Sequence, residues 1–282
     1  MNGIYLINKP KGISSHQVVQ DLIGKFNLKK AGHAGTLDPL ATGLLIVAVN
    51  DATKIIEIFQ NSDKEYIATG KFGIKTDTGD IAGNTIEQEN VNIKKTALIN
   101  CLANFPINYQ QEIPKYSAKK VKGKPLYQYA RENIGTEKFY KEVAIKNIDL
   151  IDFNNSEQTF IIRVLVSKGT FIRSLIEDIA KELKTVATMT NLKRTMQSGY
   201  ILENAKNITE INENDIISYQ EIFKDYYKQE IDYNLIKNGQ LIAKTNSEDV
   251  VLFVNDKQEP LALYKTYPKD KTKLKPWKML KK

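Results

Sequence analysis

The segment at residues 32–43 constrains the fold more than any other part of the chain. It holds three glycines and Pro39, and it stands directly before the apolar run at residues 44–49. The run is typical of a buried strand, and the glycines and proline predict a loop that bends tightly or lies close to another group. Asp38 is the acid of this loop, and a carboxylate at the mouth of a sheet is a candidate catalytic group. The alternative is an Asx turn, in which the Asp38 side chain caps its own backbone.

The sequence His-Ala-Gly-Thr-Leu-Asp-Pro-Leu-Ala-Thr-Gly at residues 33–43 resembles the catalytic motif of the bacterial tRNA pseudouridine-55 synthases, the TruB family. Further segments resemble motifs of that family and stand in the family's order, at residues 8–12, 63–66, 75–80, 114–118, 122–124 and 167–173. The match extends from about residue 3 to residue 194. Several motifs in one order make a resemblance specific, whereas a single short pattern does not.

Strand and helix patterns follow one another without βαβ regularity, which predicts an α+β fold on a mixed sheet. The resemblance implies the pseudouridine synthase fold, with a mixed, largely antiparallel sheet and flanking helices. We expect residues 1–210 to form this catalytic domain, with a tRNA-binding insertion near residues 107–140. Residues 230–282 contain a hairpin-like pattern and are similar to the PUA-like RNA-binding domain that often ends this family. We therefore expect a small β-rich C-terminal domain with a basic tail.

Apolar periodicity predicts the individual elements. Strands are expected at residues 4–7, 44–49, 66–72, 143–153 and 160–166. Helices are expected after Ser14 or Ser15, and at residues 52–60, 98–105, 125–133 and 172–183.

Composition excludes several classes of protein. The chain contains one cysteine, Cys101, and two histidines, which argues against an internal disulfide and against a structural metal site. No apolar run approaches the roughly 18 residues of a transmembrane helix, and the N-terminus lacks the features of a signal peptide. We therefore expect a cytoplasmic protein that holds no metal and does not associate with a membrane.

The positive charge of the chain is concentrated in two places. The formal net charge is +8, and residues 264–282 contain eight lysines and one aspartate. Residues 115–124 contain five lysines and no acid: Lys115, Lys119, Lys120, Lys122 and Lys124. Clustered lysines indicate phosphate contacts, and we expect the five to bind RNA. The alternative for the C-terminal lysines is a solvated, disordered tail.

The resemblance implies three catalytic residues. Asp38 matches the family's catalytic aspartate, and a carboxylate can attack covalently or stabilise developing positive charge. Arg173 matches an arginine that offsets the desolvation of this carboxylate, and we expect its fork to hold both carboxylate oxygens. Tyr66 matches an active-site tyrosine whose ring can stack on uracil and whose hydroxyl can reach a proton. Without the motifs, Tyr66 would be taken as a core residue of a strand and Arg173 as a surface residue.

Further residues are expected to bind the substrate because they match positions of the family. His33 is expected to fill or steady the stack that a flipped base leaves, and Lys9 to support the catalytic loop. Asp80 is expected either to contact the flipped loop or to cap a turn. Leu192 matches an apolar residue of the pocket, and Lys193 and Arg194 are expected on phosphates. Phe171 stands where many relatives carry tyrosine, and its ring is expected to pack without the hydroxyl contact.

The sequence therefore predicts a tRNA pseudouridine synthase that flips and isomerises uridine 55 of the TΨC stem-loop. No cofactor is expected, because the isomerisation involves no redox change. We expect a monomer with no obligate protein partner. The alternatives are an RNA-guided synthase of the same superfamily and a tRNA-folding chaperone for which catalysis is secondary. A glycosidase is disfavoured because it needs two carboxylates in defined roles.

Overall fold

The computed structural model describes residues 1–117, 119–132 and 134–281. Ala118 of the lysine-rich segment, Asn133 at the end of a predicted helix and Lys282 of the predicted tail lie outside the described residues.

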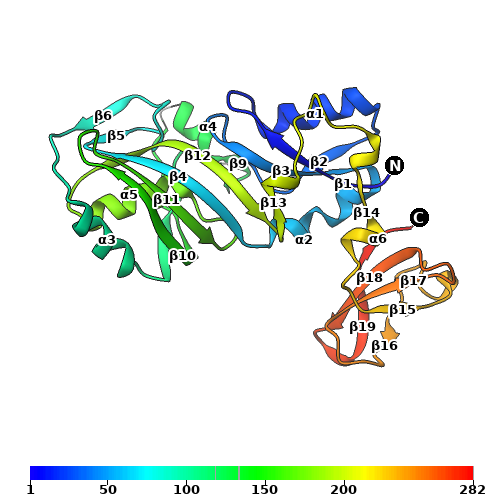
Figure 1. Ribbon diagram of the computed structural model, residues 1–282. Helices are drawn as coiled ribbons and strands as arrows, with labels where there is room; N and C mark the ends of the chain where they lie inside the picture. Colours follow the sequence, from blue (N-terminus) through cyan, green and yellow to red (C-terminus); the bar gives the residue numbers. More distant parts are fainter. Residues whose placement is uncertain (118, 133, 282) are drawn as a thin grey trace.

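The main sheet has ten strands (Figure 1). They are β1 (Gly3–Lys9), β2 (Ala31–His33), β3 (Thr42–Val49), β4 (Lys64–Phe72), β7 (Asn108–Glu112), β10 (Tyr140–Asn154), β11 (Thr159–Val166), β12 (Ala187–Gln197), β13 (Tyr200–Ile201) and β14 (Ile217–Ser218). The strand order is β14-β1-β3-β12-β4-β11-β10-β7, with β2 paired to β3 and β13 to β12. Only β12 and β3 run parallel among the described pairs of this sheet. The predicted α+β fold on a mixed, largely antiparallel sheet is confirmed.

Helices flank this sheet, as expected. They are α1 (Ser15–Phe26), α2 (Ile56–Gln60), α3 (Lys95–Ala103), α4 (Leu126–Arg131), α5 (Ile172–Glu182) and α6 (Tyr219–Ile222), with the longest 3-10 helix at η1 (Asn50–Ile55). The helix expected at residues 52–60 is therefore split between η1 and α2. No helix in the described part of the chain is long and apolar enough to cross a membrane.

Strands β1 and β3 are apolar at consecutive positions because both faces of the sheet are covered there. On one face Tyr5 and Ile7 join a core that α1, α3 and α5 complete. On the other face Ile4 and Leu6 pack into a core with η1, α2 and the C-terminal strands. Strand β4 is different, since its residues alternate between buried and half-buried.

The central strand β12 was not predicted from the sequence. It lies between β3 and β4, and its pairing with β4 shifts register between Met189 and Asn191 and again between Arg194 and Met196. Each shift disturbs the alternation of side chains between the two faces. The apolar residues of β12 therefore form neither a continuous run, as in β1 and β3, nor a regular two-residue alternation, as in β11.

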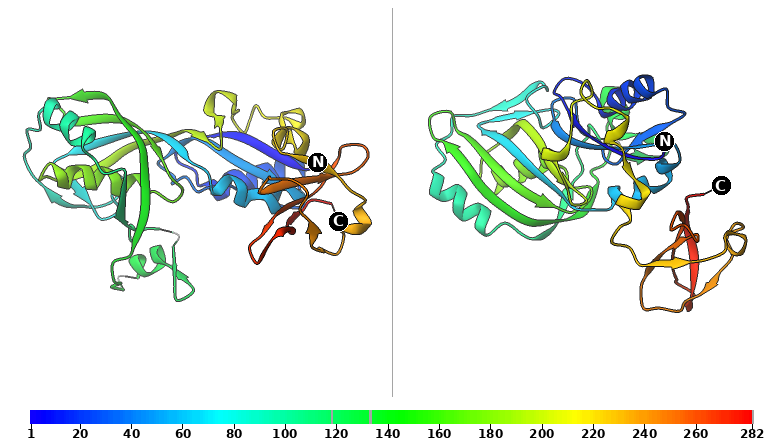
Figure 2. Two further views of the ribbon diagram at one scale, coloured as in Figure 1. Left: turned by 90° about the horizontal axis from the view of Figure 1, so that it is seen from below. Right: turned by 45° about the vertical axis from the view of Figure 1, so that its right-hand side comes forward.

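The C-terminal residues form a second sheet of five strands, in the order β15-β17-β18-β19-β16. Its strands are β15 (Lys228–Glu230), β16 (Ile242–Ala243), β17 (Val250–Val254), β18 (Pro260–Tyr267) and β19 (Asp270–Met279). In Figures 1 and 2 this orange and red unit lies at the end of the molecule that carries the N-terminus, away from α3 and α5.

The lysine-rich end of the chain is a hairpin and not a loose tail, because most of residues 264–281 lie in β18 and β19. Leu263 and Leu280 join the core that also contains Phe59. Lys278 forms an ion pair of 2.7 Å with Glu57 of α2. These contacts fix the hairpin against the main sheet.

Gly43 is held where β3 meets β12, and we predict that Gly43→Ala lowers the free energy of unfolding by about 1–3 kcal/mol. Its φ is +99°, and an added Cβ would lie 2.3 Å from the carbonyl oxygen of Arg194. Urea denaturation measures the change. Gly24→Ala in α1 is the control, because nothing lies within 4 Å of an added Cβ there, and it should raise stability by about 0.4–1 kcal/mol. Equal effects of the two substitutions would contradict the close approach at Gly43.

Candidate active site

An open cleft of about 1100 Å³ lies beside the loop that carries Asp38. Its walls come from this loop, β4, the turn at residues 78–82, the segment at residues 113–117 with Lys119, and residues 166–173. Eight of the predicted site residues line it: Asp38, Tyr66, Asp80, Lys119, Phe171, Arg173, Leu192 and Arg194. The fold thus brings together side chains that are separated by up to 156 positions in the sequence, between Asp38 and Arg194.

The Asp38 loop is fixed by hydrogen bonds on both sides of the aspartate. The Leu37 N–H donates to Ser15 Oγ at 2.8 Å, and Ser15 Oγ donates back to the Leu37 carbonyl at 3.0 Å. The Gly12 N–H donates to the Pro39 carbonyl at 2.8 Å. Within the described residues, the Asp38 carboxylate accepts no backbone hydrogen bond, so the Asx-turn alternative is not what the structure contains. Its side chain is 37% exposed and faces Arg173.

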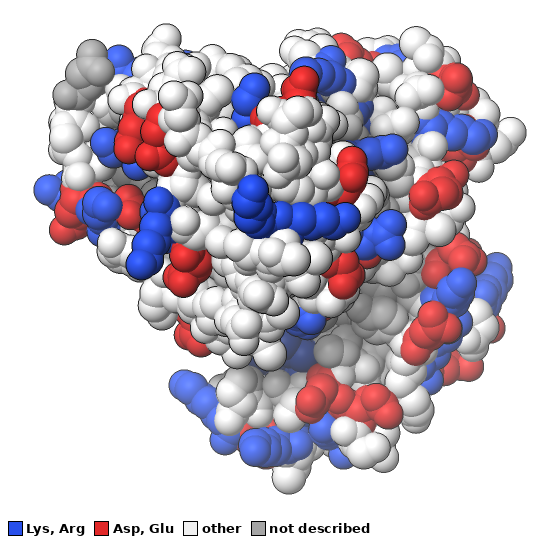
Figure 3. Space-filling model, turned by 60° about the vertical axis from the view of Figure 1, so that its left-hand side comes forward, with Lys and Arg blue, Asp and Glu red and all other residues white. Residues whose placement is uncertain are grey.

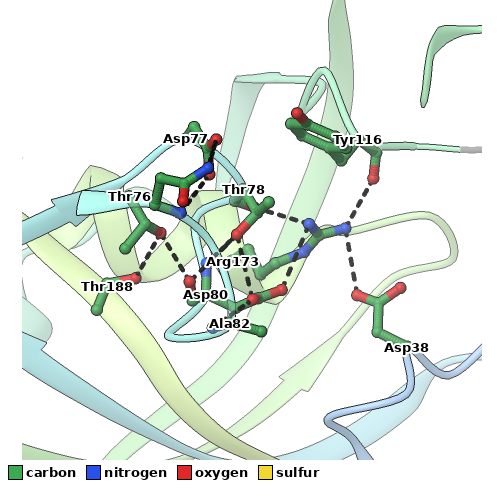
Figure 4. A network of polar contacts seen from close by, with 10 residues as sticks. Asp38, Thr76, Asp77, Thr78, Asp80, Ala82, Tyr116, Arg173 and Thr188 are labelled. Carbon is green, nitrogen blue, oxygen red and sulfur yellow. Dashed lines mark hydrogen bonds and ion pairs between the residues drawn. The ribbon is translucent and has the colours of Figure 1, made fainter. Parts of the chain in front are cut away.

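Arg173 lies in the first turn of α5, and its guanidinium joins two loops (Figure 4). Nη2 lies 3.2 Å from Asp38 Oδ2 and donates to the Tyr116 carbonyl at 2.9 Å. Nη1 donates to the Thr78 carbonyl at 2.7 Å and lies 3.7 Å from Asp80 Oδ2. The expected two-pronged pairing with Asp38 is therefore wrong, because one nitrogen serves Asp38 and the other serves the turn at Asp80. The side chain is only 9% exposed, so these partners surround the cation nearly completely.

Asp80 caps its own turn, which was one of the two predicted alternatives. Its Oδ1 accepts hydrogen bonds from the Ala82 N–H at 3.1 Å and the Thr78 hydroxyl at 3.2 Å, as Figure 4 shows. Thr76, on the same turn, donates to the Asp80 carbonyl at 2.7 Å and lies 3.1 Å from the Thr188 hydroxyl. The turn is therefore tied to β12, and Asp80 offers Arg173 a fixed second carboxylate.

Two fully buried cations lie under the Asp38 loop. Lys9 is 0% exposed and donates to the carbonyls of Pro10 and Ile13, at 2.9 and 2.7 Å. Burial lowers the pKa of Lys9 to about 8, while the charge of Asp38 acts in the opposite direction. This position suits the predicted support of the loop.

Arg194 is the second buried cation, and it does not fit the predicted contact with phosphate. It is 1% exposed, and Nε donates to the Leu44 carbonyl at 2.7 Å while Nη2 donates to the Gly35 carbonyl at 3.1 Å. Its charge is held inside the protein beneath the loop. Lys193, the next residue along β12, is exposed and is not among the residues that line the cleft.

His33 is half-buried in β2 and is also not among the lining residues. Its Nδ1 is buried and has no partner in the part of the chain that the structure describes. Burial lowers the pKa of His33, and the charges of Arg194 and His16 act in the same direction. The imidazole is therefore neutral at physiological pH, which suits the flat stacking role predicted for it.

The five predicted lysines of the segment at residues 115–124 have different surroundings. The short strands β8 (Lys120–Val121) and β9 (Lys124–Pro125) pair as a hairpin, whose segment projects from the main sheet in the left view of Figure 2. Lys115, Lys120 and Lys122 are exposed. Lys119 lines the cleft with Nζ 4.5 Å from the Phe139 ring, and Lys124 pairs with Glu132.

Sequence reasoning missed two residues that shape the cleft. Gln111 is 1% exposed, and its side-chain amide accepts from the Phe171 N–H at 2.7 Å and donates to the Phe171 carbonyl at 3.1 Å. Lys64 lines the cleft next to Tyr66. A signal for Lys64 was present, because residues two apart on a strand share one face.

Comparison with known proteins places this arrangement in a family. The TruB family pseudouridylate synthase model for the N-terminal domain matches residues 24–172. A protein named tRNA pseudouridine synthase B from Mesoplasma florum is 40% identical over 93% of this chain and 93% of its own length. One of the same name from Mycoplasma mycoides is 34% identical over 97% of this chain and 96% of its own length.

Solved structures share the fold. A chain in a structure entitled "Crystal Structure of a Cbf5-Nop10-Gar1 Complex" has a TM-score of 0.70 and 23% identity, with 94% of this chain and 78% of that chain covered. A chain in "Structure of H/ACA RNP bound to a substrate RNA containing 2'-deoxyuridine" has a TM-score of 0.69 and 22% identity, with the same coverage. At this identity the likeness establishes the fold alone.

Ser15 is the residue whose removal should release the Asp38 loop. We predict that Ser15→Ala lowers the free energy of unfolding by about 1–3 kcal/mol, because the buried Leu37 N–H loses its acceptor. Chemical denaturation measures the change. Ser156→Ala, at an exposed turn, is the control and should change stability by less than about 0.5 kcal/mol. A Ser15→Ala protein as stable as wild type would show that the loop does not depend on this pair of hydrogen bonds.

Proposed function

The chain belongs to the TruB family of pseudouridylate synthases, and we infer from this that it converts a uridine of tRNA to pseudouridine. The observation that carries the inference is the position of Asp38 in the family's motif, with its carboxylate open to the cleft and 3.2 Å from Arg173. The relatives named tRNA pseudouridine synthase B align along nearly the whole chain, so the proposal extends to the full protein.

We propose uridine 55 of the TΨC loop as the target. A base inside a folded loop cannot reach a carboxylate in a cleft, so the nucleotide has to be flipped out of its stack. Tyr66 and Leu192 line the cleft and are each 7% exposed. They offer one aromatic and one aliphatic surface to a uracil ring.

The reaction breaks the bond between N1 of uracil and C1′ of the ribose and forms a bond between C5 and C1′. The C5 proton is lost, and N1 regains a proton, so no electrons are gained or lost overall and no redox cofactor is required. We propose that the Asp38 carboxylate either attacks the sugar or the base as a nucleophile or stabilises the positive charge that develops as the bond breaks. Arg173 holds Asp38 in place. The hydrogen bonds from the Arg173 guanidinium to the Thr78 and Tyr116 carbonyls fix the guanidinium beside the cleft.

We further propose that residues 1–210 form the catalytic domain, with the RNA-binding insertion near residues 107–140. Residues 230–282 are proposed as a PUA-like unit that contacts RNA. The protein is proposed to act as a monomer on tRNA itself, without a guide RNA. Incubation of the purified chain with a bare tRNA transcript tests this, because a guide-dependent synthase would form no pseudouridine under these conditions.

Asp38→Asn should abolish pseudouridine formation and leave tRNA affinity within about tenfold of wild type, or about 1.4 kcal/mol. The amide cannot act as the anionic group, whereas phosphate contacts dominate affinity. A tritium-release or mass-spectrometric assay measures turnover, and filter binding measures affinity. Asp21→Asn is the control, since it removes one charge from the surface of α1. Wild-type turnover by Asp38→Asn would refute the catalytic assignment, and loss of binding would indicate a role in recognition.

Arg173→Lys should lower kcat/KM by about a hundredfold or more. One ammonium cannot span Asp38, Asp80 and two carbonyls at once, and small errors in position are costly to catalysis. Arg163→Lys, an exposed position on β11, is the matched control and should retain full activity. If Arg173→Lys is as active as wild type, the cation serves as a point charge and not as a bridge between the two loops.

A further inference from the structure

Three lysine ammonium groups gather at one rim of the cleft, between the turn that follows α2 and the loop that follows β11. Lys64 Nζ donates to the carbonyls of Gln60 and Ser62, at 3.1 and 2.8 Å. Lys168 Nζ donates to the side-chain oxygen of Asn61, which lies between those two residues, at 3.0 Å. Lys141 Nζ donates to the Lys168 carbonyl at 2.9 Å. Every one of these acceptors is a neutral oxygen.

The three cations repel one another. Burial is the largest cause that lowers the pKa of Lys64 to about 8, and the charges of Arg194, Lys141 and Lys168 lower it further. Burial and the charge of Lys168 lower the pKa of Lys141. The charge of Asp63 raises the pKa of Lys64, but the Asp63 carboxylate is paired with Lys146 Nζ at 2.6 Å. The folded protein therefore holds like charges together at a cost in free energy that an anion would offset.

The lack of a side chain at Gly169 leaves room for the Lys141 ammonium in this group. Gly169 has φ +77°, and an added Cβ would lie 1.8 Å from Lys141 Nζ. The ammonium thus occupies the space that a side chain would fill at this position. Lys64 and Lys141 line the cleft, and Lys168 lies between the lining residues Ser167 and Gly169, so the group borders the space that Asp38 faces.

We propose that Lys64, Lys141 and Lys168 form a binding site for a backbone phosphate of the RNA substrate. The proposal rests on the function inferred above, because it takes the anion to belong to RNA. Each ammonium has three N–H donors and uses one or two of them on acceptors within the described residues. The remaining donors match the oxygens of a phosphodiester, and such a contact fixes register without reading the base.

Local clustering matters here because basic and acidic side chains are interspersed over the face shown in Figure 3. A mixed surface attracts RNA only weakly over long distances. A group of cations whose acceptors among the described residues are all neutral oxygens therefore offers RNA a more specific place to bind.

The first test is the salt dependence of tRNA affinity for the double variant Lys141→Gln/Lys168→Gln. Loss of one phosphate contact should reduce the slope of log affinity against log salt by about 0.7 to 0.9, and we expect a reduction of that size. The matched control is Lys94→Gln/Lys95→Gln, which removes two exposed charges at the start of α3. Lys141→Arg/Lys168→Arg should keep the wild-type slope. Equal slopes for the two glutamine variants would overturn the proposal.

The second test identifies the phosphate. In T-arm stem-loops with a single methylphosphonate, one position near the target uridine should weaken binding to wild type at least fivefold and leave the Lys141→Gln/Lys168→Gln variant unaffected. If every position that weakens wild type weakens the variant equally, the lysines do not contact a phosphate. Pseudouridine formation by wild type is measured in parallel. Turnover with an unchanged salt slope rejects the phosphate site alone, whereas absence of turnover rejects the proposed function.

Discussion

The buried guanidinium of Arg173 is the interaction on which the site depends. A cation that is 9% exposed is stable only if its donors are satisfied and its charge is balanced. Three segments meet these needs: the Asp38 loop, the turn at Thr78 and Asp80, and the segment at Tyr116. The same contacts therefore balance the charge and fix the relative positions of loops that are distant in the sequence. Removal of this cation would take away a partner that Asp38 and Asp80 share.

A second layer of cations supports this arrangement from below. Lys9, Lys64 and Arg194 are each less than 7% exposed, and all of them donate to main-chain carbonyls. Carbonyls satisfy the donors without cancelling the charge. The charges of these three side chains therefore remain beneath the cleft, close to the loop that carries Asp38.

The sequence predicted the parts of the molecule whose signal is local. The apolar runs predicted β1 and β3, and the motifs around Asp38 and Arg173 pointed to residues that the fold brings to one cleft. Strand β12 was missed because two register shifts disturb its alternation. The roles given to Arg194 and to the fork of Arg173 were wrong for a different reason. Their partners are main-chain carbonyls, those of Leu44, Gly35, Thr78 and Tyr116. Because every residue has such a carbonyl, the residue type does not indicate which one accepts the hydrogen bond.

The docking of the C-terminal hairpin has a consequence for how the protein meets a large partner. A free lysine tail would lose conformational entropy whenever it became ordered on a ligand. Here the strands β18 and β19 are already ordered, and the pair of Lys278 with Glu57 ties them to α2. The C-terminal hairpin and the cleft are therefore held at a constant separation. A partner that contacts both surfaces must have a length and curvature that match this separation. Such a partner can be recognised by its overall shape, without sequence-specific contacts to the part that lies between the two surfaces.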